Sequence, residues 1–142
     1  MSDNLRKMVE EEGLHLAERN FSVNSHKALL LSEAAKEEDE RIFYALHDRI
    51  FKAYFTEGQN ISDPNVLQDL SDEAGVSEET VHKAWRESRY EAILNETLEL
   101  AAWKGINGVP TFIIGDRVVV GAVPTTTLLD TARGVHRTVS TR

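Results

Sequence analysis

One stretch near the C-terminus constrains the fold more than any other part of this chain. Residues 111–114 and 117–120 are β-branched or aromatic at nearly every position, as is typical of β-strands. The pair between them, Gly115-Asp116, suits a two-residue type II′ turn with glycine first. Gly105 is a helix stop before this stretch, and Pro124 is a helix start after it. The sequence therefore predicts a tight antiparallel hairpin between two helices.

The rest of the chain has apolar residues at helical spacing, so the fold is predicted to be mostly helical. Asp63-Pro64 and Ser77 are helix-start signals, while Gly13 and Gly75 are helix stops. The segment Leu14–Phe21 alternates weakly and predicts either a short strand or an extended connection. Helices are expected over about 3–13, 24–36, 39–55, 63–75, 77–104 with a break near Ser88, and 124–133, with fraying from Gly134 onward.

Composition bounds the class of protein. A chain of 142 residues with 41% apolar and 28% charged residues fits a single globular domain, residues 1–142. No segment approaches the ~20 apolar residues of a membrane span, and residues 1–12 lack an apolar signal core, so the expected location is cytoplasmic. The net charge of −8 disfavours nucleic acid as a partner. The absence of cysteine excludes disulfides, thiolate metal ligands and a thiol nucleophile.

Two motifs carry a resemblance to a known family. Gly-Ile-Asn-Gly-Val-Pro-Thr-Phe at 105–112, followed by Gly-Ala-x-Pro at 121–124, is similar to the DsbA-like thioredoxin-fold family. Asn24-Ser25 with an alanine-rich helix, and the segment 53–63, resemble its FrnE-like branch. Relatives of that branch are the 2-hydroxychromene-2-carboxylate isomerases and the kappa-class glutathione transferases. The resemblance places this chain in an oxidoreductase family while its usual redox cysteines are absent.

The resemblance implies a fold and a candidate site. The fold is α/β and mostly helical, with a helical insertion-type bundle over 24–89 and the C-terminal half of a thioredoxin-like fold over 90–136. Val109-Pro110 is implied to be the family's cis-proline loop, which lies against the redox or glutathione site. The candidate binding loop is then made of four residues: Gly108, Val109, Pro110 and Thr111.

The chain departs from the family pattern at its start. Family members open with a strand, a Cys-x-x-Cys or equivalent serine site on the first helix, and a second strand. Residues from about Leu14 to Arg133 match the later portion, so those first elements are expected to have no counterpart here. We therefore predict no catalytic residue and no cofactor. Glutathione could bind only if another chain completed the site.

This departure predicts an exposed strand edge. In the family the first strand of the hairpin pairs with the first strand of the fold, so Thr111, Phe112, Ile113 and Ile114 would present an unpaired apolar edge. Such edges recruit other chains. The first hypothesis is a non-catalytic binding or assembly module that forms a homodimer by pairing two such edges. The alternative is an oxidoreductase or isomerase subunit, for disulfide exchange or glutathione-dependent isomerisation, that a partner polypeptide completes.

A weaker alternative rests on residues 67–85. Their Ala-Gly-Val-Ser-x-x-Thr-Val centre resembles a repressor-type helix-turn-helix, with Gly75 at the turn. Residues 62–90 nevertheless hold seven acids against three bases, a net charge of −4. Glu78 and Glu79 would meet phosphates at the start of the recognition helix, so they are better interpreted as first-turn acids on the helix dipole. A DNA-binding regulator is therefore the third hypothesis.

The remaining notable residues have structural interpretations. The five histidines include no pair at i,i+3 or i,i+4 spacing, so we predict no metal site. Several aromatic side chains are predicted to be core residues, although they could also line a ligand groove. These are Tyr54, Phe55, Trp85 and Trp103. Three serines are predicted to be helix caps rather than nucleophiles: Ser25, Ser62 and Ser77.

Overall fold

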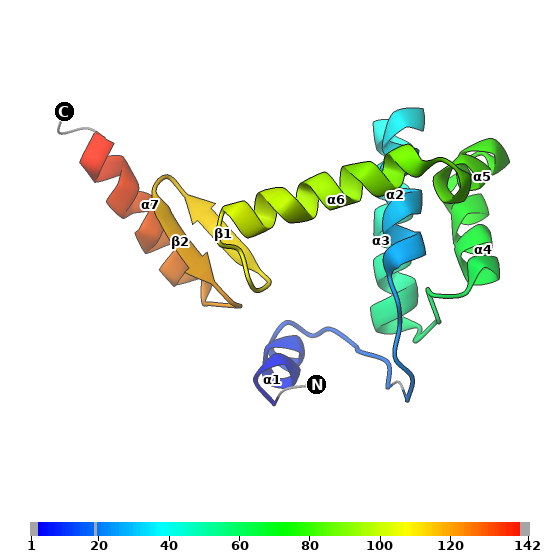
Figure 1. Ribbon diagram of the computed structural model, residues 1–142. Helices are drawn as coiled ribbons and strands as arrows, with labels where there is room; N and C mark the ends of the chain where they lie inside the picture. Colours follow the sequence, from blue (N-terminus) through cyan, green and yellow to red (C-terminus); the bar gives the residue numbers. More distant parts are fainter. Residues whose placement is uncertain (1–2, 19, 140–142) are drawn as a thin grey trace. The chain divides into compact units, whose positions relative to one another are not determined.

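A computed structural model of the chain describes residues 3–18 and 20–139. The chain divides into two compact units, residues 1–95 and 96–142. The elements, in chain order, are α1 (Asp3–Glu11), α2 (His26–Glu38), α3 (Glu40–Phe51), the π-helix η1 (Lys52–Thr56), α4 (Pro64–Ala74), α5 (Glu78–Arg86), α6 (Ser88–Trp103), β1 (Thr111–Ile114), β2 (Arg117–Val120) and α7 (Thr125–Val139) (Figure 1).

Short polar side chains begin several of these helices, as their positions in the sequence predict. Asp39 accepts hydrogen bonds from the first backbone amides of α3, Asp63 does so before Pro64 of α4, and Ser77 accepts from the amide of Thr80 in α5. Gly75 closes α4 with a φ of +81°, a conformation that L side chains rarely adopt. Local sequence therefore sets these boundaries.

Two of the three predicted serine caps are wrong. The side chain of Ser25 makes no capping bond, because Asn24 Oδ1 accepts from the backbone N–H of His26 and takes that place. The hydroxyl of Ser62 accepts from the backbone N–H of Asn24 at 2.7 Å and so joins two segments of the chain. Ser25 is thereby left on the face of α2 described below.

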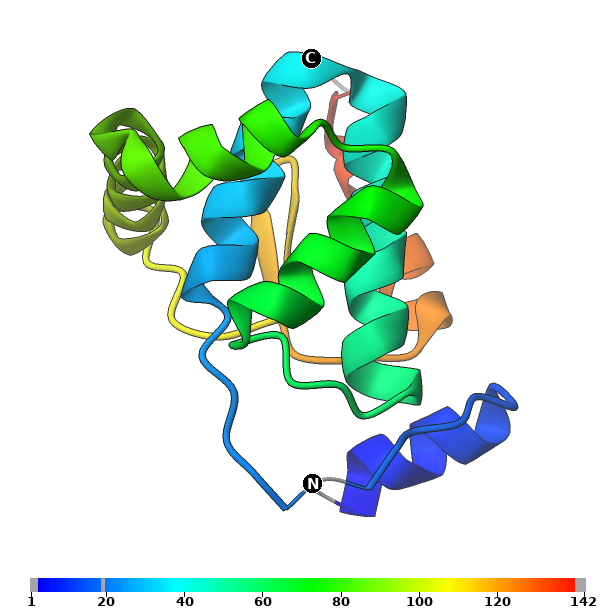
Figure 2. The ribbon, with the colours of Figure 1, turned by 90° about the vertical axis from the view of Figure 1, so that its right-hand side faces the viewer.

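The core of the first unit lies among α2, α3, α4 and α5 (Figure 2). Its centre consists of leucine and valine side chains with 0–1% exposure: Leu31, Leu46, Leu67, Leu70 and Val81. The hydroxyl of Ser71, also fully buried, donates to the carbonyl of Leu67 at 2.7 Å, which satisfies the polar atom within its own helix. These helices thus enclose a well-satisfied apolar core.

The helix predicted over 39–55 is confirmed in its extent, but beyond Phe51 it is a π-helix rather than an α-helix. The chain there widens into the π-helix η1, in which the N–H of Glu57 donates to the carbonyl of Lys52, five residues earlier. Gly58, with a φ of +68°, ends this turn, and the N–H of Gln59 donates to the carbonyl of Ala53. Ala53 is fully buried, so the wide turn fits against the core.

The hairpin of the second unit matches its prediction residue for residue. Among the described residues, β1 and β2 form a two-stranded antiparallel sheet in which Thr111 faces Val120 and Ile114 faces Arg117. Gly115 has a φ of +64° and Asp116 does not have a positive φ, as a type II′ turn requires. The four residue pairs and the turn type together confirm the predicted hairpin.

The final helix α7 packs on both strands. It continues to Val139, so the predicted fraying from Gly134 is wrong for residues 134–139. Gly134 lies beside Arg117 of β2: a Cβ at this glycine would be 3.8 Å from the guanidinium group. This is an ordinary van der Waals distance, so the packing of α7 on β2 at this position does not require a glycine.

Other predictions about the connections have mixed outcomes. The break near Ser88 is confirmed, because α5 ends at Arg86 and α6 begins at Ser88. The described part of Leu14–Phe21 contains no strand and is an extended connection. The prediction that Trp103 is a core residue is wrong, since this residue is 82% exposed. Over the described residues, no helix combines the length and apolar character that crossing a membrane requires.

Candidate binding sites

The four predicted loop residues meet in one turn before β1. The Val109–Pro110 peptide bond is cis. The hydroxyl of Thr111 donates to the carbonyl of Gly108 at 2.6 Å, and the carbonyl of Pro110 accepts from the N–H of Gly121 at 2.7 Å. These two bonds hold the loop against the hairpin while the side chain of Val109 stays 92% exposed. The loop therefore offers an apolar tip on a well-braced backbone.

The hydrogen-bond pattern of the hairpin shows which backbone groups face outward. Opposite residues alternate between hydrogen-bonded and non-hydrogen-bonded pairs, and the bond between Gly121 and Pro110 fixes the order. Ile113 and Val118 therefore form a non-hydrogen-bonded pair. The N–H and C=O groups of Thr111 and Ile113 point away from β2. Within the described residues, β1 pairs with β2 alone.

The two faces of the hairpin differ. Phe112 and Val119, which are opposite each other, are half-buried on the face that α7 covers. Ile113, Val118 and Val120 lie on the other face, and their side chains are 50%, 57% and 55% exposed. Such a cluster of exposed β-branched side chains is typical of a surface made for contact.

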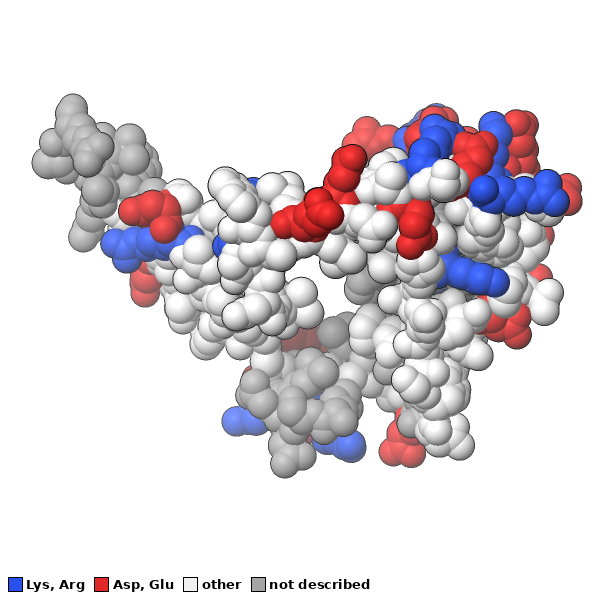
Figure 3. Space-filling model, viewed as in Figure 1, with Lys and Arg blue, Asp and Glu red and all other residues white. Residues whose placement is uncertain are grey.

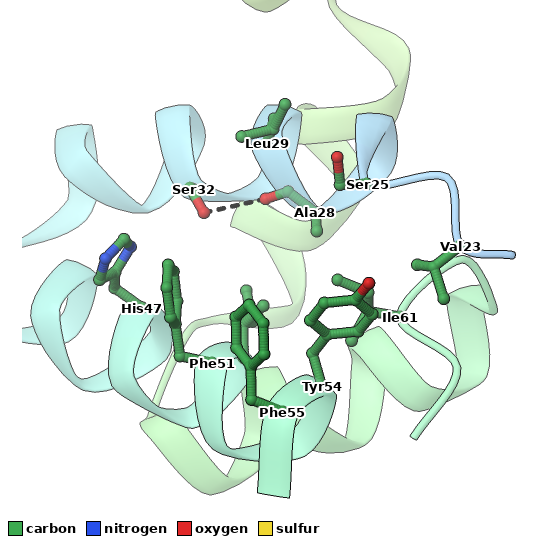
Figure 4. A pocket seen from close by; sticks show the side chains of 11 residues that line it. Val23, Ser25, Ala28, Leu29, Ser32, His47, Phe51, Tyr54, Phe55 and Ile61 are labelled. Atoms are coloured by element: carbon green, nitrogen blue, oxygen red, sulfur yellow. Dashed lines mark hydrogen bonds between the residues drawn. The ribbon is translucent and has the colours of Figure 1, made fainter. Parts of the chain in front are cut away.

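A pocket of about 310 Å³ lies in the first unit, between α2 on one side and α3 with η1 on the other (Figure 4). Its apolar walls come mostly from Leu29, Ile50, Phe51, Phe55 and Ile61. A few polar side chains also reach it. These are Ser25 just before α2, Ser32 from α2, His47 from α3 and Tyr54 from η1.

Aromatic rings form a row along one wall of this pocket. Figure 4 shows His47, Phe51 and Phe55 side by side, directed toward α2. The ring centroids of His47 and Phe51 are 4.7 Å apart, and those of Phe51 and Phe55 are 5.6 Å apart. The ring of Tyr54 packs edge-on against Phe55 at 4.7 Å. The spacing of four residues stacks these side chains along one helix face.

Charged contacts fix the wall that carries the rings. The guanidinium group of Arg49 in α3 contacts Glu57 at 3.0 Å, just after η1, and Glu73 of α4. The hydrogen bond with Glu73 raises the pKa of Arg49, and the same bond lowers the pKa of Glu73. The N–H of Ala17 donates to the carbonyl of Phe55 at 2.8 Å. The π-helix is thus fastened at both of its sides.

Sequence reasoning identified only part of this pocket. Tyr54 and Phe55 were expected to be core residues or groove residues, and they line the pocket. Ser25 was expected to be a cap, while Leu29, His47 and Phe51 were assigned to no site. A usable signal was present in the repeat of aromatic rings at positions 43, 47, 51 and 55. Four-residue spacing is found both in a buried stripe and in the wall of a pocket. The repeat was therefore interpreted as a buried stripe, and the pocket was missed.

Charges of both signs are mixed on the face that Figure 3 shows. Figure 3 shows acidic and basic side chains side by side at the end of the helical unit where α5 lies. Glu78 and Glu79 occupy the first turn of α5, as expected. Among the described residues there is no group of three or more His, Asp or Glu side chains placed to hold a metal ion.

Comparison with known proteins assigns the family. The profile of the DSBA-like thioredoxin domain matches residues 1–132. This chain belongs to the DSBA-like thioredoxin domain family. Its hairpin, flanking helices and helical bundle are accordingly a partial thioredoxin-like α/β fold. The FrnE-like branch within this family stays a prediction.

One protein similar in sequence to this chain is an uncharacterized bacterial protein. The chain is 32% identical over 121 residues to the uncharacterized protein YwbO of Bacillus subtilis (strain 168). The aligned part covers 83% of this chain and 60% of YwbO. The chain therefore spans about three-fifths of the length of this relative.

Proposed function

We propose that this DSBA-like chain is a non-redox binding or assembly module that pairs with a second copy of itself through β1. Disulfide exchange needs a thiolate, and none of the 142 residues is cysteine. The observation that carries the proposal is the outward edge of β1, where Thr111 and Ile113 direct their backbone groups away from β2. Antiparallel pairing of two such edges would give each of these groups a partner.

The side chains around this edge support the same proposal. Ile113 and Val120 are at least half exposed and β-branched, so a second hairpin would bury apolar area beside the new backbone bonds. Val109, at the tip of the preceding loop, adds to this exposed apolar surface.

The test is the native mass in solution, measured by light scattering over a wide concentration range, for the chain and two matched variants. Ile113→Pro removes an outward N–H from the β1 edge, while Val118→Pro removes one from the β2 edge. Both positions belong to the same non-hydrogen-bonded pair, so the hairpin's own bonds are spared alike. We expect a dimer for the original chain and for Val118→Pro, and a monomer for Ile113→Pro.

Other results would contradict this assignment. A monomer at every concentration would refute self-association. Equal loss of the dimer in both variants would show that pairing does not depend on the β1 edge.

The second candidate is an oxidoreductase-family or isomerase-family subunit that another polypeptide completes. It is favoured by the exposure of the loop at Val109, whose side chain is 92% exposed. Under this proposal glutathione would bind only in the completed assembly. The test is a pull-down with the original chain, with variants of the loop 108–111 and with Val118→Pro. A partner that binds in stoichiometric amounts to the original chain and to Val118→Pro, but not to the loop variants, would favour this candidate over the homodimer.

A further inference from the structure

We propose that the pocket between α2 and the α3–η1 wall binds a planar, uncharged aromatic small molecule that carries a hydroxyl or carbonyl group. The pocket volume of about 310 Å³ is at the low end of the range for small-molecule sites. It lies wholly among residues 23–61 and does not depend on the edge of β1. The proposed ligand binding can therefore be tested independently of the proposed dimer.

The lining determines the charge of the ligand. Among the eleven described residues around the pocket there is no Lys, Arg, Asp or Glu. A charged ligand would lose hydration without gaining an opposite charge, which is costly in an apolar site. An uncharged ligand avoids this cost, and its apolar surface gains from contact with Leu29 and Ile61.

The row of rings determines the shape. Phe51 and Phe55 are 51% and 36% exposed, so each has ring surface that a ligand could cover. Their neighbour His47 extends the row toward one end of the pocket (Figure 4). A flat ring placed between this row and α2 can contact them in the offset or edge-to-face arrangements that aromatic rings prefer.

The polar atoms determine the functional group. Figure 4 shows His47 and Ser32 toward the same end of the pocket. The hydroxyl of Ser32 donates to the carbonyl of Ala28 at 2.9 Å, so toward a ligand it serves as an acceptor. A ring nitrogen of His47 can donate or accept according to its tautomer. A phenolic hydroxyl or a ring carbonyl at this end would therefore find a partner.

The π-helix supplies a further reason to regard this pocket as a binding site. Tyr54 and Phe55 lie on η1, and π-helical turns occur frequently at functional sites. The contacts of Arg49 with Glu57 and Glu73 hold this turn in place. These contacts restrict the motion of the wall, which reduces the entropy that binding would cost.

The probe for the test is β-naphthol, titrated into the full chain and followed by amide and methyl NMR shifts and by calorimetry. We expect shifts confined to α2, α3 and η1. The saturated analogue decahydro-β-naphthol should bind about fivefold more weakly or worse, because it cannot stack. Phe51→Leu should raise the Kd for β-naphthol about fivefold for the same reason.

Matched variants separate the pocket from general stickiness. Tyr44→Leu removes a 57% exposed ring from the same helix, outside the pocket lining, and should leave the Kd unchanged. His47→Phe, which keeps a ring in the row, should weaken β-naphthol about fivefold but leave naphthalene unaffected, because only the former has a hydroxyl to lose its partner. Circular dichroism and thermal unfolding of each variant confirm that the fold is kept.

Three results would overturn the proposal. One is the absence of shifts up to the solubility limit of β-naphthol, and another is an equal effect of Tyr44→Leu and Phe51→Leu. The third is a set of concentration-dependent shifts in this pocket without any ligand, abolished by Phe51→Leu. That last outcome would assign the pocket to contact with a second copy.

Discussion

The two units of this chain bury their side chains very differently. Between Ala28 and Tyr90 the helical bundle encloses residues with almost no exposed surface, such as Leu46 and Leu67 at 0%. After Tyr90, up to Gly134, no described side chain reaches that class. The hairpin and its helices carry large apolar residues as well, but Leu98 is 67% exposed and Val120 is 55% exposed.

The difference shows what each unit needs in order to be stable. Four helices can surround one apolar core from all sides. A two-stranded hairpin with a helix on one face leaves its second face open, and such a small sheet is marginal in water. The bundle is therefore stabilised by its own contacts, while the hairpin unit leaves large apolar side chains exposed.

The largest test of this comparison is a pair of truncations. Leu46→Ala in the bundle should lower the free energy of unfolding by about 2–5 kcal/mol, because it leaves a cavity in a closed core. Val119→Ala in β2 should cost less than about 1 kcal/mol, since its side chain is only half-buried. Urea unfolding followed by circular dichroism measures both.

Similar losses for the two variants would show that the hairpin unit is as well packed as the bundle. A dimer that stabilises the hairpin would produce this result only above the concentration at which the chain associates. Measurement at two protein concentrations distinguishes these cases.

The comparison also explains which features the sequence could predict. Short-range signals were sufficient for the turn at Gly115-Asp116 and the cap at Ser77, since each depends on a few adjacent residues. They were insufficient for Trp103, because an apolar residue at helical spacing is buried only if another element covers it. The DSBA-like resemblance predicted the family correctly for this reason: its motif is local.

The pocket could not have been predicted in the same way. The period of the aromatic residues is the same for a buried stripe and for a ligand wall, and the widening of α3 into η1 has no local signal such as proline or glycine within residues 52–56. Whether the helix widens at this point depends on how Ala53 fits against the core. The period of apolar residues in the sequence does not predict such tertiary packing.

Hydrogen exchange on the full chain sharpens the comparison at the level of single amides. At low concentration, the amides of β1 and β2 should exchange about a hundredfold faster than those at the centres of α2 and α3, because few buried contacts oppose opening of the hairpin. The outward amides of Thr111 and Ile113 should slow as the concentration rises if the edges pair. The amide of Val118, on the opposite edge, is the matched control.

Uniform protection across both units would contradict the proposed difference. Slowing at Val118 rather than at Ile113 would place the contact on β2 and refute the edge assignment.

The smallest expected effect concerns Tyr90, the last buried side chain of the bundle. Burial raises the pKa of Tyr90 to about 12, and its hydrogen bond to Glu37 at 3.0 Å adds to the rise. The unfolded chain has an ordinary tyrosine pKa near 10. Folding therefore favours the neutral phenol, and this contribution is fully present below about pH 10 and is lost between about pH 10 and 12.

We expect the free energy of unfolding to fall by about 2 kcal/mol more over that interval in the original chain than in Tyr90→Phe. Urea titrations at a series of alkaline pH values measure the difference. Tyr44→Phe, which removes a hydroxyl from an exposed ring, should retain the original slope. Equal slopes for Tyr90→Phe and the original chain would mean that Tyr90 is solvated at high pH. The closed core of the bundle would then end before this residue, and the contrast between the two units would begin earlier in the chain.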